Sequence, residues 1–174
     1  TATGGAKKVT VKWAKVAGAK GYVIFGSKCG KKMKKLATVS KSKKQWVQKK
    51  LKKGTYYKYM VVAYATVGGV KQVVSTSTSV HAATNGGKKG NPTAVTVKKA
   101  KLTVKKGQSA SIKASVKSKK KFSVHIAKLR YESADTSIAT VNKKGKVTGK
   151  KKDKVKVYAY AQNGVSKVVT VTVK

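Results

Sequence analysis

The stretch YESADTSIATV at residues 131–141, followed by GKVTG at 145–149, decides how the second half of the chain folds. Ser133 and Asp135 carry short polar side chains that can close a turn by hydrogen bonding to nearby backbone groups. Apolar residues follow at positions that point inward, and Gly145 can adopt the positive φ that a tight hairpin requires. The stretch therefore predicts a turn, a strand, a hairpin and a second strand.

These residues resemble the marker segment of bacterial Ig-like domains of group 2. Under this resemblance Ile138 and Val141 pack inward, and Leu102–Gly107, LTVKKG, is similar to the opening strand and turn of the module. The resemblance covers about residues 93–174, although the segment Lys117–Lys128 is longer than the family usually has. It implies a β-sandwich of the kind that recurs in tandem on secreted and surface-anchored bacterial proteins, as spacers, adhesins or wall-binding units. It does not imply a reaction.

Alternating apolar residues also mark strands in the first half. The residues VTVKW at 9–13 place apolar and polar side chains in turn, and YKYMVVA at 57–63 repeats this period of two. Such alternation is typical of half-buried strands. The glycine pair at 68–69 predicts a hairpin. Short strands at this spacing, about seven in all, predict a β-sandwich.

Three features of the first half resemble a fibronectin type III domain. Trp13 matches the core tryptophan of that family's second strand, and Gly21–Ile24 resembles the start of the third. Leu51–Tyr57 is similar to the approach to the sixth strand, with its last residue in the tyrosine-corner position. The resemblance covers about residues 9–84. Because so few residues precede Trp13, the first strand is either missing or built from Thr1–Lys8.

A shift in composition marks the joint between the halves. The segment Asn85–Pro92 gathers three glycines and the only proline of the chain between valine-rich stretches, which predicts a linker. The expected domains are a fibronectin type III-like sandwich at 1–84, the linker at 85–92 and an Ig-like sandwich at 93–174. The predicted fold class is all-β, with two tandem Ig-like or fibronectin-type β-sandwiches joined by a short Gly-rich linker.

The charge of the chain is lopsided. Forty-two lysines and one arginine stand against three acids, for a formal net charge of +40. Valine occurs twenty-seven times and leucine four times, a composition typical of β-strands. No run of about 18 apolar residues is present, so we predict no transmembrane segment. The chain opens without a basic and apolar leader, which favours a mature segment or an excised piece of a larger protein.

The residues that could carry catalysis are few and scattered. Cys29, His81 and His125 lie far apart in sequence, and each favours a structural or surface role. Glu132 and Asp135 are neighbours, but they belong to the predicted structural turn. Nucleophile-elbow and phosphate-loop motifs are absent from the sequence. We therefore expect no enzyme, no catalytic or cofactor-binding residues and no metal ligands.

Lysine runs are the candidate binding residues. Solvated loops would explain any single run, but ordinary solubility needs only mixed charge, and the acids are too few for salt bridges. An anionic partner would account for the whole set, because a strongly positive surface accumulates polyanions. The candidate polyanion-binding residues are Lys31, Lys32, Lys34, Lys35, Lys49, Lys50, Lys52, Lys53, Lys119, Lys120, Lys121, Lys150, Lys151 and Lys152.

Two tyrosines add a finer hint. Tyr158 and Tyr160 share one face of a predicted strand with Lys156, while Val155 and Val157 take the opposite face. The tyrosines could stack against sugars or bases. The alternative is that they cover a half-exposed sheet.

Taken together, these features predict a non-enzymatic, extracellular pair of modules on the bacterial cell surface or cell wall. Its predicted role is cell adhesion or retention on an anionic cell-wall polymer or glycan through the lysine clusters, as a monomer within a larger multidomain chain. Two alternatives stay open: nonspecific binding of nucleic acid or another polyanion, and a passive structural spacer. A single arginine argues against sequence-specific reading of bases.

Overall fold

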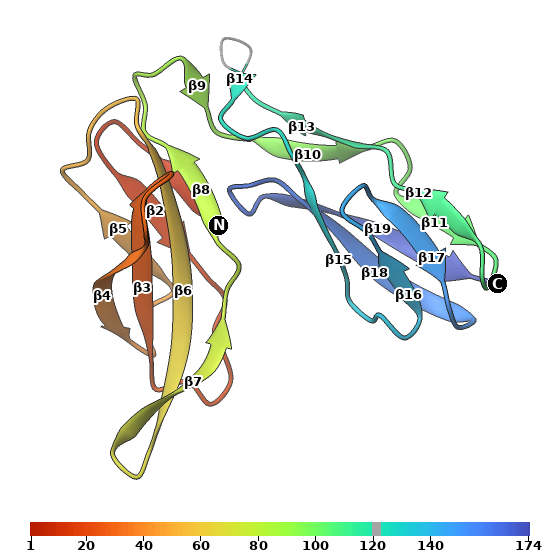
Figure 1. The fold of residues 1–174 in the computed structure, drawn as a ribbon, viewed down its shortest axis with the longest axis horizontal. Helices are drawn as coiled ribbons and strands as arrows, with labels where there is room; N and C mark the ends of the chain where they lie inside the picture. The colour runs from red at the N-terminus through yellow and green to blue at the C-terminus, as the bar shows by residue number, and fades with distance from the viewer. Residues whose placement is uncertain (120–122) are drawn as a thin grey trace. The chain divides into compact units, whose positions relative to one another are not determined.

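The computed structural model describes residues 1–119 and 123–174. Strands, turns and loops make up these residues, with no helix among them, which confirms the all-β prediction. The chain divides into two compact units, Thr1–Asn91 (unit 1) and Pro92–Lys174 (unit 2). Figure 1 shows the strands of each unit in the colours of the chain.

Unit 1 is built from two antiparallel sheets. One sheet has the order β1-β2-β5, and the other has the order β4-β3-β6-β7, with β8 also pairing with β6. Its strands are β1 (Ala2–Gly4), β2 (Val9–Lys12), β3 (Gly21–Lys28), β4 (Lys34–Ser40), β5 (Gln45–Gln48), β6 (Tyr56–Val67), β7 (Val70–Thr76), β8 (Val80–Ala83) and β9 (Lys89–Gly90). The twelve residues of β6 run the length of the unit (Figure 1).

The core of unit 1 follows the predicted alternation. Alternate residues of β2, of β3 and of β6 from Tyr57 to Ala63 are buried, and the two sheets meet through these side chains. The buried set is Val9, Val11, Tyr22, Ile24, Tyr57, Tyr59, Val61 and Ala63. Trp13 follows β2 and packs against this cluster with its ring centroid 5.3 Å from that of Tyr22. Alternation therefore places the apolar half of each strand between the sheets.

The fibronectin type III features predicted for unit 1 are present. The Tyr57 hydroxyl accepts a hydrogen bond from the Lys52 backbone N–H at 3.3 Å, as a tyrosine corner does. A first strand exists, since β1 pairs with β2 and Ala2 is fully buried. The amino group of Thr1 also donates to the Lys12 carbonyl at 2.7 Å. The segment before β2 therefore supplies the first strand.

The Gly-rich segment after β8 is tied down by hydrogen bonds. Asn85 donates its backbone N–H to the Gly5 carbonyl at 2.8 Å. The Asn91 amide pairs with both backbone groups of Ala83, accepting at 2.7 Å and donating at 2.8 Å. The predicted linker is thus anchored to unit 1 up to Asn91.

Unit 2 is also a sandwich of antiparallel-rich sheets. A four-stranded sheet has the order β11-β19-β18-β15, a three-stranded sheet has the order β12-β17-β16, and β10 pairs with β13. The strands are β10 (Ala94–Val97), β11 (Lys101–Val104), β12 (Ser109–Ser111), β13 (Ala114–Lys117), β14 (Ser123–Val124), β15 (Arg130–Ser133), β16 (Ala139–Val141), β17 (Lys146–Gly149), β18 (Asp153–Tyr160) and β19 (Ser166–Val173). Alternate residues of β18 and β19 form much of its core.

The opening strand of unit 2 comes in two pieces. The sequence predicted only Leu102–Gly107, which contains most of β11 and the turn after it. The structure adds β10, which pairs antiparallel with β13, whereas β11 pairs parallel with β19. The chain therefore changes sheets between β10 and β11. Neither piece alternates over more than four residues, so the earlier piece gave little sequence signal.

The decisive stretch of unit 2 forms as predicted. The Ser133 hydroxyl donates to the Asp135 carbonyl at 2.9 Å, and the Asp135 carboxylate accepts from the Ser137 backbone N–H at 2.8 Å. Ile138 and Val141 pack against the core. Gly145 has a φ of 78° in the turn that joins β16 to β17. A turn closed by its own side chains fixes where β16 begins.

Substitution of Gly145 tests the hairpin. A Cβ at this position would lie 2.8 Å from the Tyr131 ring, in addition to the strain of positive φ. We expect Gly145→Ala to lower the free energy of unfolding of unit 2 by about 2–4 kcal/mol. Gly107→Ala is the matched control, since its φ is also 78° but no atom lies within 4 Å of the added Cβ. Its expected cost is about 1 kcal/mol. Amide hydrogen exchange in β18 measures both changes, and equal losses would contradict the steric account.

Acid should weaken the same turn. The hydroxyl and backbone N–H of Ser137 hold the pKa of the Asp135 carboxyl below its ordinary value of 3.8, with a smaller contribution from the charge of Lys151. Because the folded pKa is depressed, the stabilisation is complete above the ordinary value and is lost as pH falls through the folded value. Asp135→Asn keeps an acceptor oxygen without titrating. We expect its melting temperature to fall less than that of the wild type between about pH 5 and about pH 2. Parallel acid-induced losses in the two proteins would refute this.

Candidate functional site

The lysines lie on the surface of both units. Every lysine that the structure describes, except the half-buried Lys58, is exposed. None of these described lysines pairs with a carboxylate, and the ion pair that the structure does contain joins Arg130 and Glu132. The positive charge therefore faces solvent without local neutralisation, so its field is available to a ligand.

Antiparallel connectivity gathers alternate loops at the same end of unit 1. The β1–β2 turn and the β5–β6 loop touch, because the Leu51 backbone N–H donates to the Lys7 carbonyl at 2.9 Å. The β5–β6 loop also meets the segment after β8, where the Gly54 N–H donates to the Asn85 carbonyl at 3.0 Å. Three lysine-bearing segments that are distant in sequence are thus hydrogen-bonded together.

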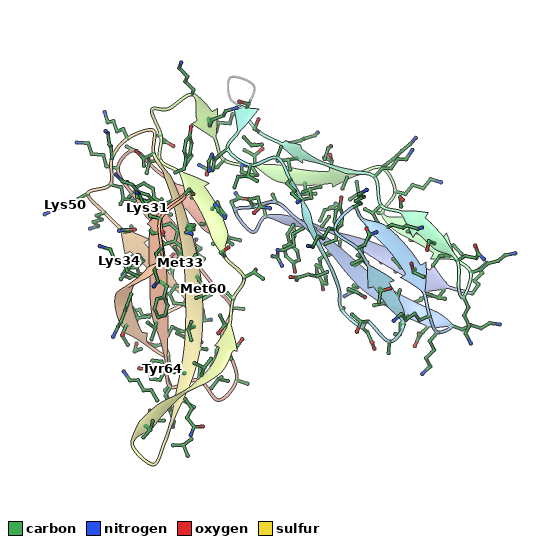
Figure 2. The ribbon with its side chains drawn as sticks, in the orientation of Figure 1. Lys31, Met33, Lys34, Lys50, Met60 and Tyr64 are labelled. Carbon is green, nitrogen blue, oxygen red and sulfur yellow. The ribbon has the colours of Figure 1, made fainter. Side chains whose placement is uncertain are left out.

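The β3–β4 turn lies at the same end. The Cys29 backbone N–H donates to the carbonyl of Tyr56, the first residue of β6, at 2.9 Å. We call the whole group the lysine end of unit 1. Its members are Lys7, Lys8, Lys28, Lys31, Lys32, Lys49, Lys50, Lys52, Lys53, Lys88 and Lys89, all exposed. Lys31 and Lys50 are labelled in Figure 2. No acid occurs anywhere in the sequence of unit 1, so nothing within the unit offsets this charge.

Glycines set how closely these loops approach. A Cβ on Gly87 would lie 2.7 Å from the Cα of Gly54, so the two backbones meet where any side chain would collide. Gly54 and the non-glycine Lys50 both have positive φ, at 61° and 57°. Positive φ turns the β5–β6 loop sharply, which presents its four lysines on a compact bend.

Unit 2 has a smaller lysine cluster at one of its own ends. The Lys106 N–H donates to the Lys174 carbonyl at 2.8 Å, and the Gly107 N–H donates to the Gly149 carbonyl at 2.9 Å. These bonds join the β11–β12 turn to the end of β17 and to Lys174, which follows β19. The cluster consists of Lys105, Lys106, Lys150, Lys151, Lys152 and Lys174. Asp153 and Asp135 belong to the same unit, so this cluster is less uniformly positive than the lysine end of unit 1.

The structure sorts the candidate lysines predicted from sequence. It brings the runs at 31–32 and 49–53 together in unit 1, while Lys34 and Lys35 open β4 as exposed residues (Lys34 is labelled in Figure 2). Lys119 is exposed two residues after β13. Lys120 and Lys121 lie outside the described residues.

Sequence reasoning missed several members of both clusters. Pairs such as Lys7-Lys8 and Lys88-Lys89 are too short to stand out as runs, and they are distant from the β5–β6 loop in sequence. A strand count could have found them, because alternate turns of an antiparallel sandwich fall at the same end. The membership of these lysines in the cluster is therefore indicated by the order and direction of the strands rather than by composition.

The predicted tyrosine face exists, but its rings are engaged. Tyr158 and Tyr160 stack with centroids 5.8 Å apart and ring planes at 18°. The Arg130 guanidinium carbon lies 4.6 Å from the centroid of the Tyr160 ring. These contacts are worth about 0.5–1.5 kcal/mol each and cover sheet surface. The two tyrosine rings therefore pack on each other and on Arg130 over the face of the sheet. Stacking of these rings on a ligand stays a proposal.

The chemically reactive side chains of unit 1 form one pair. The Cys29 Sγ atom lies 3.3 Å from the His81 Nδ1 atom. Burial raises the pKa of the Cys29 thiol, against a smaller lowering effect of the Lys58 charge. A raised pKa keeps the thiol protonated at neutral pH, so it is a poor nucleophile. The unit also has no carboxylate that could orient the imidazole.

Comparison with known proteins identifies the second sandwich. Residues 92–173 match the family model described as bacterial Ig-like domain (group 2). Unit 2 is a bacterial Ig-like domain of group 2. Domains of this family are typical of bacterial surface or extracellular proteins, and they are typically non-enzymatic. The residues that the structure describes contain no helix long and apolar enough to cross a membrane.

Solved structures with similar folds include three of different kinds. A β-1,2-glucanase from Parabacteroides distasonis is 20% identical, with a TM-score of 0.43, over 49% of this chain and 12% of its own. The fn3 domain of the human collagen alpha-1(XX) chain is 15% identical, with a TM-score of 0.39, over 49% and 79%. The C-terminal 282-residue fragment of intimin, in complex with the intimin-binding domain of the translocated intimin receptor, is 16% identical, with a TM-score of 0.38, over 99% and 61%. No curated protein matches the chain.

Screening by salt should stabilise the protein. Like charges gathered at the ends of both units repel one another, and added salt shortens the range of that repulsion. We expect the melting temperature to rise by about 5 °C between low and moderate sodium chloride, the shift that about 1 kcal/mol produces in domains of this size. Calorimetry over a salt series measures it, and a flat or falling trend would contradict the repulsion.

Proposed function

We propose that this chain is a non-enzymatic pair of modules that retains a bacterial surface protein on anionic cell-wall polymers, and so serves adhesion. The observation that carries the proposal is the lysine end of unit 1. Its eleven exposed lysines lie on the β1–β2, β3–β4 and β5–β6 connections and on the segment after β8, and unit 1 has no acid. The bacterial Ig-like family of unit 2 supports the surface setting.

The geometry favours a flexible linear polyanion. The lysines are exposed and surround a bend of backbone, so neighbouring charges along a polymer can engage them together. Binding would release counterions, as it does when lysines neutralise the phosphates of a nucleic acid. Lysine suits this role because its ammonium is a point charge on a flexible stem and needs no fixed ligand geometry.

Two other functions compete with wall retention. Nucleic acid is also a linear polyanion, so the lysines could bind its phosphates. However, a single arginine leaves little capacity for bidentate contacts to bases. A passive spacer would need no ligand, and the engaged state of Tyr158 and Tyr160 fits that reading of unit 2. The clustering in unit 1 favours wall retention over the spacer, because scattered lysines would serve solubility equally well.

Neutralising one end of unit 1 tests the proposal. The test variant changes Lys49, Lys50, Lys52 and Lys53 to Gln. The matched control changes Lys15, Lys20, Lys41 and Lys43 to Gln, which removes the same charge from exposed positions in the β2–β3 and β4–β5 loops. We expect the test variant to bind walls bearing anionic polymer at least about tenfold more weakly than the control, since a lysine near an anionic surface contributes about 1 kcal/mol.

The ligand arms of that experiment separate the competing functions. Walls bearing teichoic acid, walls stripped of it, duplex DNA and neutral glycans are compared at physiological salt. Preference for the intact walls, lost in the test variant alone, supports the proposal. Equal affinity for walls and DNA that disappears together as salt rises would support a generic polyanion effect. Equal binding by test and control variants would overturn the lysine end as the site.

A further inference from the structure

The β6–β7 hairpin exposes the large apolar side chains that unit 1 does not bury. Val67, Val70, Val73 and Val74 are 57%, 64%, 68% and 43% exposed. All residues from 66 to 79 are exposed, including every residue of β7. By contrast, Val23 in β3 is half-buried, and Val61 and Val62 earlier in β6 are buried. The hairpin therefore presents apolar surface that the unit's own core does not use.

One edge of β7 is unpaired among the described residues. β7 pairs only with β6, from Val62↔Thr76 to Val67↔Val70, and the chain then returns to β6 as β8. Sheet edges in proteins are usually protected by prolines, charges, β-bulges or covering segments. β7 has one irregularity of this kind, at Val74, where its pairing with β6 shifts register, and it is regular from Val70 to Val73. Residues 66–79 contain neither proline nor acid. Their single lysine, Lys71, lies with its Nζ atom 4.7 Å from the centroid of the Tyr64 ring, over the sheet face rather than across the edge. Tyr64 is labelled in Figure 2 near this hairpin.

The valines of β7 lie on both of its faces. Strand alternation puts Val70 on one face and Val73, with Lys71, on the other, and Val74 is the extra residue where the pairing with β6 shifts register. An added strand would shelter side chains on both faces while pairing with the free backbone groups of β7. Strand addition of this kind takes affinity from backbone hydrogen bonds and specificity from alternate side chains.

The positive charge of unit 1 favours an acidic partner for this edge. Unit 1 has no acid, β7 itself carries Lys71, and Lys20 adds positive charge on the β3 side of β6, where its backbone N–H donates to the Tyr64 carbonyl at 2.8 Å. A second copy of the chain would bring the same positive charge to the edge. We propose that β7 is a docking edge for an extended acidic segment of a partner protein, which adds to the sheet as a further strand.

This edge is separate from the lysine end. β6 begins at Tyr56 among the lysine-bearing loops and ends at Val67 in the hairpin, so about 35 Å of strand lies between them. Figure 1 shows the β7 hairpin at the opposite end of β6 from the segment after β8. The proposal for β7 can therefore fail or succeed independently of wall binding.

A peptide titration tests the proposal. The probe is a short peptide of alternating valine and glutamate, and the control peptide has the same sequence with alternate backbone nitrogens methylated, so that it cannot donate strand hydrogen bonds. We expect the probe to bind the full chain at least about tenfold more tightly than the control at physiological salt, a difference of about 1.4 kcal/mol. Amides of β7 should become protected from hydrogen exchange only with the probe.

Substitutions locate the binding edge. Val70→Thr together with Val74→Thr keeps β-branched shapes on exposed positions, so the fold should persist. We expect this variant to bind the probe about tenfold more weakly and to bind walls unchanged. The Lys49, Lys50, Lys52 and Lys53 to Gln variant should retain the methylation-dependent preference. Equal binding of both peptides would overturn the proposal, as would salt-promoted self-association that the valine substitutions abolish, since that result assigns the edge to a second copy.

Discussion

The structure depends on the period-two alternation of its strands, because this is what lets so positive a chain fold. Alternation sends valine and tyrosine between the sheets and sends lysine to solvent. With three acids in the chain, salt bridges cannot offset the repulsion, so burial of apolar surface must do so. The core of unit 1 therefore forms from tyrosine and aliphatic residues, the core of unit 2 forms largely from valine, and every described lysine but Lys58 stays outside.

Local patterns were predictable from the sequence because they act over a few residues. Trp13, Tyr57 and the turn at Asp135 depend on neighbours close in the chain, and all three took their predicted places. The lysine end of unit 1 was not predictable from runs alone, because Lys7 meets the β5–β6 loop only through sheet topology. The exposure of Val73 was also missed, since strand composition does not reveal whether a second sheet covers that strand.

The two sandwiches are both rich in β-strands and lysine, but they differ in where their acids lie. Unit 1 has no acid and gathers its lysines around a glycine-tightened bend. In unit 2, Asp135 closes a turn and Glu132 pairs with Arg130 within β15. These carboxylates also keep their charge, so they lower the positive field of unit 2. The uneven distribution leaves unit 1 as the stronger source of positive field.

The length of β6 has a mechanical consequence. This strand runs from the lysine-bearing loops to the β7 hairpin, and eight of its residues pair in register with β3. A pull that enters at the β3–β4 turn of the lysine end and leaves at the hairpin acts on opposite ends of the paired strands β3 and β6, so it loads their hydrogen bonds in shear and shares the force among them. Pulling across the sheet would instead break the same bonds one after another. Attachment at opposite ends of these two paired strands would therefore let unit 1 carry tension.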